Sequence, residues 1–232
     1  MATKHDVKTW GILTATLVIV FAGTMISSPR ARANQDRQNQ NNQNSDPRTD
    51  PRIARGFKIA PVHLNLAGKD PNLVGLGSYL VNAVGACDDC HSVSEYAQNR
   101  NPYFGQKKKI DPTDYLGGGA DFGPLVPGSP DIVSRNLTPD KTGLPEGGHT
   151  FDEFRQIIQT GVDLDHLHPS CSATVTTNCL PPPFDGEVLQ IMPWPIYQNW
   201  TDDDLRAIYE YLSAIPCYAG PPAPSPLHND CN

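Results

Sequence analysis

The chain has 232 residues, of which 18 are Lys or Arg and 25 are Asp or Glu, so its formal net charge is −7. This acidic balance argues against a nucleic-acid-binding protein, which needs a basic face, and the 23 Pro and 19 Gly residues exclude a coiled coil. Only 38% of the residues are hydrophobic. The totals therefore predict a small, loop-rich domain that needs something besides apolar side chains to hold it together.

The first element of the chain has the features of an export signal. Lys4 and Lys8 precede an uncharged run over residues 10–26, and Ala31-Arg32-Ala33 places small residues where signal peptidase cleaves. Residues 1–33 are therefore expected to be a signal peptide, with a membrane anchor retained through residues 10–26 as the alternative. Both interpretations place the remaining chain outside the cytoplasm, in the periplasm or exported, where thiols oxidise.

A linker is expected to follow the leader. Asn34 to Arg55 consists mainly of Gln, Asn, Asp, Arg and Pro, with almost no apolar side chain. Such a segment buries too little apolar surface to offset its chain entropy, so residues 34–60 are expected to be disordered. The folded domain is then expected over residues 61–216, followed by a Cys- and Pro-rich tail over residues 217–232.

Hydrophobic periodicity predicts three helices in this domain, over residues 73–87, 150–160 and 201–215. The second begins with a capping box formed by Thr150 and Glu153, and the third ends before a proline. Long Gly- and Pro-rich loops lie between the helices, and no stretch alternates as a strand would. The expected class is all-α.

The segment Cys87-Asp88-Asp89-Cys90-His91 carries the chemistry of the chain. In a CxxCH motif, two thiols one turn apart can add to the vinyl groups of a haem, and the adjacent imidazole then binds the iron. A haem would also supply the large apolar centre that the composition lacks. The motif predicts one haem c, attached through Cys87 and Cys90, with His91 as an axial ligand.

Other uses of these cysteines fit less well. A thioredoxin-type pair begins a helix after a strand, whereas this pair is expected at a helix end. A structural zinc site needs further ligands, usually a second close pair, and Cys171 and Cys179 are eight residues apart. A disulfide between Cys87 and Cys90 would leave His91 without a role.

Met192 is the candidate for the sixth ligand of the iron. Because Met1 and Met25 lie in the leader, Met192 is the one thioether left in the expected mature chain. A single methionine usually fills a core. This one lies in the segment Met192-Pro193-Trp194-Pro195, where prolines stiffen the backbone, and that position favours the ligand.

These motifs together resemble those of class I c-type cytochromes, most closely the bacterial mono-haem type with an MPWP loop. The resemblance rests on residues 77–91, on NLTPD at residues 136–140 and on residues 192–215. It implies a cytochrome c fold, with short helices and long loops wrapped around one covalently attached haem. It also implies that the first and last helices cross near Gly77 and the stretch 209–212.

The resemblance also implies roles for single residues. His91 and Met192 would be the two axial ligands, Asn136 and Thr138 would lie in a loop of the haem pocket, and Trp194 would pack close to the haem. Residues 163–186 and the tail after residue 216 depart from the family pattern, so no family role is carried over to them.

Four further cysteines lie outside the CxxCH motif, and they allow three pairings. The expected pairing is local, Cys171 with Cys179 and Cys217 with Cys231, because each pair closes a short loop in an oxidising compartment. The alternative is that some of these thiols are free or bind a partner.

Two polar features have open roles. His166 and His168 are expected in a surface loop or hydrogen-bonded to a haem propionate rather than on a metal, since residues two apart do not share a helix face. Lys107-Lys108-Lys109 is expected to be a solvated run, with a docking site for an acidic partner as the alternative.

The expected function is that of an exported electron-transfer protein, not an enzyme. It would carry single electrons between a dehydrogenase or respiratory complex and an acceptor, either as a free carrier or as a subunit of such a complex. Its partners would be redox proteins and not nucleic acid, with a membrane involved only if the leader is retained. The alternative is a haem enzyme or gas sensor in which Met192 leaves the sixth position of the iron open.

Overall fold

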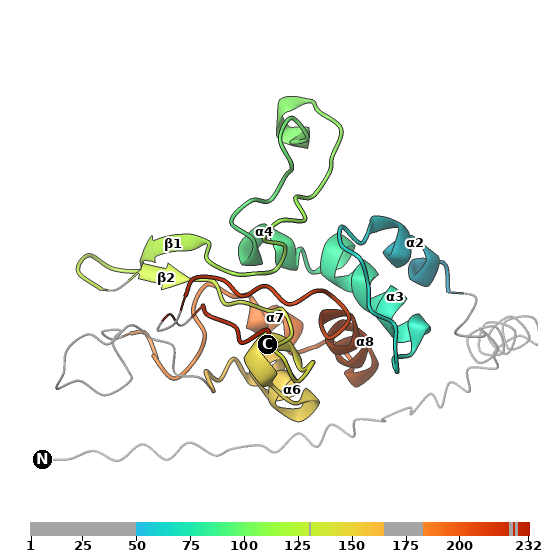
Figure 1. The fold of residues 1–232 in the computed structure, drawn as a ribbon. Coiled ribbons are helices and arrows are strands. Elements are labelled where there is room, and N and C mark those ends of the chain that lie inside the picture. Colours follow the sequence, from blue (N-terminus) through green and yellow to red (C-terminus); the bar gives the residue numbers. More distant parts are fainter. Residues whose placement is uncertain (1–49, 130, 165–182, 223–224, 226) are drawn as a thin grey trace, which may run out of the picture. The chain divides into compact units, whose positions relative to one another are not determined.

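The computed structural model describes residues 50–129, 131–164, 183–222, 225 and 227–232 (Figure 1). These residues belong to one compact unit. The leader and most of the expected linker lie outside the described residues, as do Cys171, Cys179, His166 and His168.

Helices α3 (Pro71–Tyr79) and α8 (Asp202–Leu212) pack against each other at the centre of the unit. The side chain of Asp70 caps α3, and that of Thr201 caps α8. The two helices approach at Gly77, where an added Cβ would lie only 1.9 Å from the carbonyl oxygen of Ala207. Glycine is therefore required here because the backbones touch, and this contact lies within the helical stretches in which the crossing was expected.

Residues 51–59 form a helix, α2 (Pro51–Ile59), so the expectation of a disordered linker up to residue 60 was wrong. Gly56 of α2 packs on Gly75 of α3: a Cβ added to Gly56 would lie 1.8 Å from the carbonyl oxygen of Gly75. The hydroxyl of Ser78 donates to the Gly56 carbonyl at 2.8 Å. Close backbone contact at Gly56 and the side chains of Ile53 and Phe57, which pack on Gly75, together hold α2 against α3.

The helix expected over residues 73–87 is interrupted. After α3 the chain forms a π-helical turn over Leu80–Val84, and Ala86 then adopts a left-handed conformation with φ 50°. A separate short helix, α4 (Cys87–His91), contains the whole CxxCH motif. The expectation that the motif ends a longer helix was therefore wrong: the motif begins a new helix at a strained residue.

Two short strands lie beyond α4, β1 (Asp121–Pro124) and β2 (Asp131–Val133), and they pair antiparallel (Figure 1). The expectation of no strand was wrong, because these strands are too short and too exposed to show alternation. The remaining elements are η3 (Pro102–Phe104), α5 (Pro145–Gly148), α6 (Phe151–Thr160) and α7 (Trp194–Tyr197). In α6 the Thr150–Glu153 capping box is confirmed.

Buried tyrosines connect the long loop after residue 111 to the helices. The hydroxyl of Tyr115 donates to the side-chain oxygen of Asn82 at 2.6 Å and lies 2.9 Å from the hydroxyl of Tyr211 in α8. Each buried polar group in this trio is thereby satisfied. Among the described residues, no helix is both long and apolar enough to cross a bilayer.

Candidate functional site

A cavity of about 640 Å³ brings together the residues that carry the predicted chemistry. Cys87, Cys90, His91 and Met192 all line it. Its volume falls within the roughly 300–1,000 Å³ of sites for small molecules and cofactors. Apolar side chains from loops and from α6 and α8 form much of the remaining wall: Leu137, Phe154, Ile158, Leu189, Ile208 and Leu212.

The two cysteines of α4 are free thiols. Burial, with a smaller contribution from the charge of Asp88, raises the pKa of Cys87 to about 12. Burial and nearby carboxylates also raise the pKa of Cys90. Thiol–disulfide exchange needs a lowered thiol pKa, so this environment disfavours the thioredoxin-type use of the motif.

His91 is held by two hydrogen bonds from different loops. Its Nδ1 lies 2.8 Å from the carbonyl oxygen of Arg135, and its own carbonyl accepts from the N–H of Gly118 at 2.8 Å. Burial lowers the pKa of the imidazole, which favours the neutral ring. Because the Arg135 carbonyl can only accept, Nδ1 carries the proton, and the lone pair of Nε2 is left for a metal.

Arg135 also has a second function at this wall. Its guanidinium pairs with the carboxylate of Asp163, which follows α6. The two side chains are 11% and 2% exposed, and both residues line the cavity. The pair therefore joins the His91 loop to the end of α6. No motif marks either residue, so sequence reasoning missed them.

The loop before Met192 is strained and fixed from outside the cavity. Ile191 has φ 69°, which is unfavourable for a β-branched residue. The indole N–H of Trp194 donates to the Leu189 carbonyl at 3.1 Å, and its ring packs over Gly161, where an added Cβ would lie 2.3 Å away. Trp194 is not among the residues that line the cavity; it attaches the Met192 loop to the end of α6.

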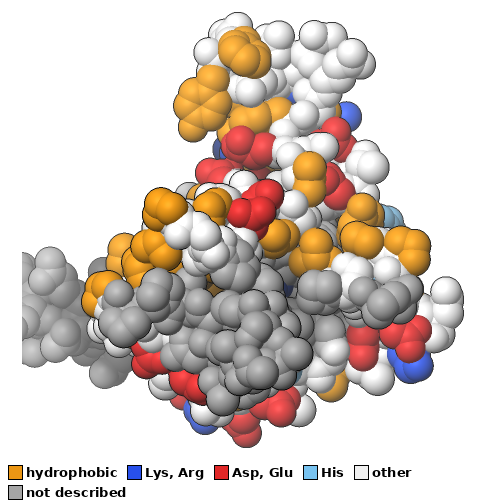
Figure 2. Space-filling view, turned by 90° about the vertical axis from the view of Figure 1, so that its left-hand side faces the viewer, with side chains coloured by type: hydrophobic (Ala, Val, Ile, Leu, Met, Phe, Trp, Pro, Cys, Tyr) orange, Lys and Arg blue, Asp and Glu red, His pale blue; other side chains and the backbone are white. Residues whose placement is uncertain are grey.

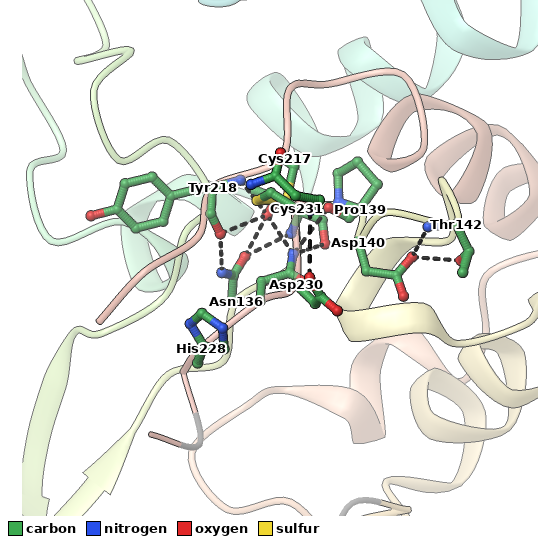
Figure 3. The surroundings of a disulfide bond; sticks show 12 residues. Asn136, Pro139, Asp140, Thr142, Cys217, Tyr218, His228, Asp230 and Cys231 are labelled. Carbon is green, nitrogen blue, oxygen red and sulfur yellow. Dashed lines mark hydrogen bonds between the residues drawn. A yellow bond between two sulfur atoms is a disulfide. The ribbon is translucent and has the colours of Figure 1, made fainter. Parts of the chain in front are cut away.

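Asn136 turns toward the C-terminal tail (Figure 3), and Thr138 bonds to the same tail. The Asn136 amide donates to the Tyr218 carbonyl at 2.8 Å, and the Tyr218 N–H donates to the Thr138 hydroxyl at 3.0 Å. Leu137, between them, faces the cavity. The two polar residues therefore fix the backbone of this wall, while their side chains lie outside it.

The tail is part of the fold rather than an appendage to it. A disulfide joins Cys217 to Cys231 (Figure 3), and the buried Asn229 amide donates to the carbonyls of Thr138 and Pro139 at 3.1 and 3.0 Å. Ser225 and Leu227 line the cavity. The expected boundary at residue 216 was wrong, and the spacing of the two cysteines was its one sequence signal.

Two free thiols, an imidazole with an available Nε2, and a thioether thus line one largely apolar cavity. This donor set fits a haem attached through two thioether bonds and bound by His and Met.

Comparison with known proteins points the same way. The chain is 30% identical over 143 residues to the gluconate 2-dehydrogenase cytochrome c subunit of Pantoea cypripedii. The matched region is 60% of this chain and 22% of that protein, so the chain spans about a fifth of its relative's length. No family model and no solved structure matches the chain. The similarity supports an electron-transfer cytochrome with a haem cofactor.

Proposed function

We propose that the protein is a mono-haem c-type cytochrome that transfers single electrons. The observation that carries the proposal is the shared cavity, in which Cys87, Cys90, His91 and Met192 meet among apolar side chains. The similarity to a cytochrome c subunit supports the same class. The proposal includes a cytochrome c fold, in which α3 and α8 cross and loops surround the haem.

Each residue of the site would have a separate task. Cys87 and Cys90 would hold the haem covalently, and His91 Nε2 and Met192 Sδ would bind its iron. A haem iron bound in this way takes up and releases one electron. The Arg135 carbonyl orients the His91 ring through Nδ1. The apolar wall excludes water from the cavity and so favours the reduced, less charged state.

We propose a place for this chain beside a dehydrogenase. The relative is named as the cytochrome c subunit of gluconate 2-dehydrogenase. By analogy, this chain would accept electrons from a partner dehydrogenase or respiratory complex in the periplasm and pass them to an acceptor. It would act there as a subunit or as a free carrier, and export would follow from residues 1–33.

Covalent attachment is tested by extraction. Protein matured with haem should keep its pigment in acidified organic solvent, whereas the Cys87→Ser/Cys90→Ser variant should lose it. The matched control is Cys217→Ser/Cys231→Ser, which removes two cysteines but no thiol that lines the cavity, and it should keep the pigment. A colourless wild type, or one whose pigment extracts freely, contradicts the proposal.

The Met192 ligand is tested by spectroscopy and potentiometry. The oxidised wild type should show the sulfur-to-iron charge-transfer band, and the reduced protein should not bind carbon monoxide. Met192→Ala should lose the band, bind carbon monoxide, and have a midpoint potential lower by on the order of 0.1 V, since axial ligands tune haem potentials over about 0.8 V. The exposed Ile196 in α7 provides the control substitution, Ile196→Ala.

A wild type that lacks the band and binds carbon monoxide at once would favour the alternative, a haem enzyme or gas sensor with an open sixth position. An unchanged potential in Met192→Ala would remove Met192 from the iron. Neither outcome would contradict covalent attachment of the haem, because extraction tests that part of the proposal separately.

A further inference from the structure

A loop that has no part in the cavity projects from the body just after α4 (Figure 1). We call residues 97–109 the tip loop. A bridge between Tyr96 and Ile110 closes its base. Beneath this bridge, the carboxylate of Asp114 accepts from the N–H groups of Val93 and Ser94 at 3.1 and 3.0 Å.

Internal hydrogen bonds give the tip loop a defined shape. The Ala97 N–H donates to the Lys109 carbonyl at 3.0 Å. The Asn101 side chain accepts from the Tyr103 N–H at 2.9 Å and so caps the short helix η3 at the outer end. The side chains at this end are therefore presented on a fixed backbone.

Two consecutive aromatic side chains lie exposed on η3. Tyr103 is 81% and Phe104 78% exposed, the largest values among the exposed large hydrophobic side chains of the described residues. Hydrophobic side chains gather at the outer end of the projection (Figure 2). Large apolar groups presented in this way on a fixed loop indicate a contact surface.

The charge of the tip loop is opposite to that of the chain. It contains four cations, Arg100 and Lys107 to Lys109, and no acidic residue. Without them the chain has 14 basic and 25 acidic residues, a net charge of −11. The Lys109 N–H donates to the Arg100 carbonyl at 3.3 Å, so the two limbs that carry these cations meet behind the aromatic end, and the Lys108 ammonium lies over the Tyr96 ring at the base.

We propose that the tip loop docks the domain on an anionic lipid surface. Tyr103 and Phe104 would enter the headgroup region, and the cations behind them would attract lipid phosphates. Aromatic side chains ahead of basic ones match the order of layers at a membrane interface. A projecting end suits a deformable surface, and the acidic remainder of the chain restricts contact to this loop by repulsion.

The test uses the full haem-loaded chain and vesicles of phosphatidylcholine, with or without phosphatidylglycerol. Sedimentation measures binding, and hydrogen exchange followed by mass spectrometry shows which segment is covered. Wild type should bind the anionic vesicles, with slower exchange within residues 97–109 and weaker binding at high salt. Local exchange is needed because residues 10–26, if retained, would bind vesicles without the loop.

Variants separate the two parts of the surface. Lys107→Gln/Lys108→Gln should weaken the binding that protects the loop roughly thirtyfold, whereas the charge-matched control Arg55→Gln/Lys58→Gln in α2 should not. Tyr103→Ser/Phe104→Ser should weaken it roughly tenfold or more, with Ile196→Ser as the control for loss of an exposed apolar group.

Three results would overturn the proposal. The first is vesicle binding without slower exchange in residues 97–109, and the second is equal protection by neutral vesicles. The third is protection by poly-glutamate but not by anionic vesicles, which would identify an acidic protein as the occupant. Haem attachment is measured independently, so none of these results depends on the proposed electron transfer.

Discussion

The helices and the loops of this domain are held together by opposite means. In the helical region, formed by α2, α3 and α8, glycines allow backbones to touch at Gly56, Gly75 and Gly77. In the loop region, residues 116–137 and the described part of the tail, side chains bond to distant backbone and a disulfide closes the chain. At these three positions the first region depends on a side chain being absent, whereas the second region depends on particular polar side chains being present.

The largest effect should come from adding a methyl group to the helical region. In Gly77→Ala the new Cβ would lie 1.9 Å from the Ala207 carbonyl oxygen, so the helices must separate. We expect the free energy of unfolding to fall by about 3 kcal/mol, the upper end for overpacking. Chemical denaturation of the haem-loaded protein measures it.

The matched control lies in the loop region. Gly123 in β1 has φ 70° and nothing within 4 Å of an added Cβ, so Gly123→Ala introduces backbone strain without a clash. Its cost should be about 1–2 kcal/mol. If both substitutions cost the same, contact between the helix backbones is not what limits position 77.

The disulfide tests the loop region directly. Cys217 and Cys231 are 14 residues apart, and a loop of this size predicts a loss of about 3 kcal/mol or less for Cys217→Ser/Cys231→Ser. Faster hydrogen exchange should appear in the tail and around Thr138, but not in α3. Uniformly faster exchange would mean that the two regions unfold as one.

Asp88 lies in α4, between the helical region and the loop region, and its burial can be tested by pH. Neither of its carboxylate oxygens has a hydrogen-bond partner among the described residues, and burial, then the charge of Asp89, raises its pKa to about 6. The folded state therefore holds this proton more tightly than the unfolded chain, so stability should fall as the pH rises from about 4 to about 6.

Asp88→Asn should remove that loss, giving about 2 kcal/mol more stability at pH 7 and little change at pH 4. The exposed Glu187 provides the control, Glu187→Gln, which removes an equal charge away from Asp88. Denaturation at several pH values measures both variants. If Asp88→Asn keeps the wild-type dependence of stability on pH, the Asp88 carboxylate is not the buried, unpartnered group that causes it.

The smallest effect concerns the strained residues before the candidate ligands. Ala86 and Ile191 both have positive φ, 50° and 69°. Ala86→Gly should relieve strain but add freedom to the unfolded chain, so the net gain should stay below about 1 kcal/mol. Ile191→Gly should gain slightly more, because a β-branched residue fits this conformation worst. Thermal unfolding compares the two.

Local signals explain what the sequence could predict. The Thr150–Glu153 capping box and the cap at Thr201 depend on neighbours within one turn, and both helices form where the pattern indicates. The CxxCH motif likewise sets the spacing of its two cysteines and its histidine within five consecutive residues. Met192 was found by elimination, and the structure places it on the same cavity as His91.

Long-range backbone contacts explain what the sequence could not predict. The polar composition of residues 34–55 made α2 look like linker, although its Gly56, Ile53 and Phe57 all pack on α3 at Gly75. Asn229 reaches Thr138 across 91 residues, and Trp194 turns to Gly161 rather than to the cavity. Polar side chains near a motif can therefore hold the backbone around a cavity in place without lining the cavity themselves.

The tail also has a consequence for the order of assembly. Leu227 follows His91 by 136 residues in the chain, yet both line the same cavity. During synthesis from the N-terminus, Cys87 and Cys90 emerge long before the segment that completes the wall of their cavity. We therefore expect the cavity to stay open to a large ligand, and to the enzyme that delivers it, until oxidation of Cys217 and Cys231 closes it behind them.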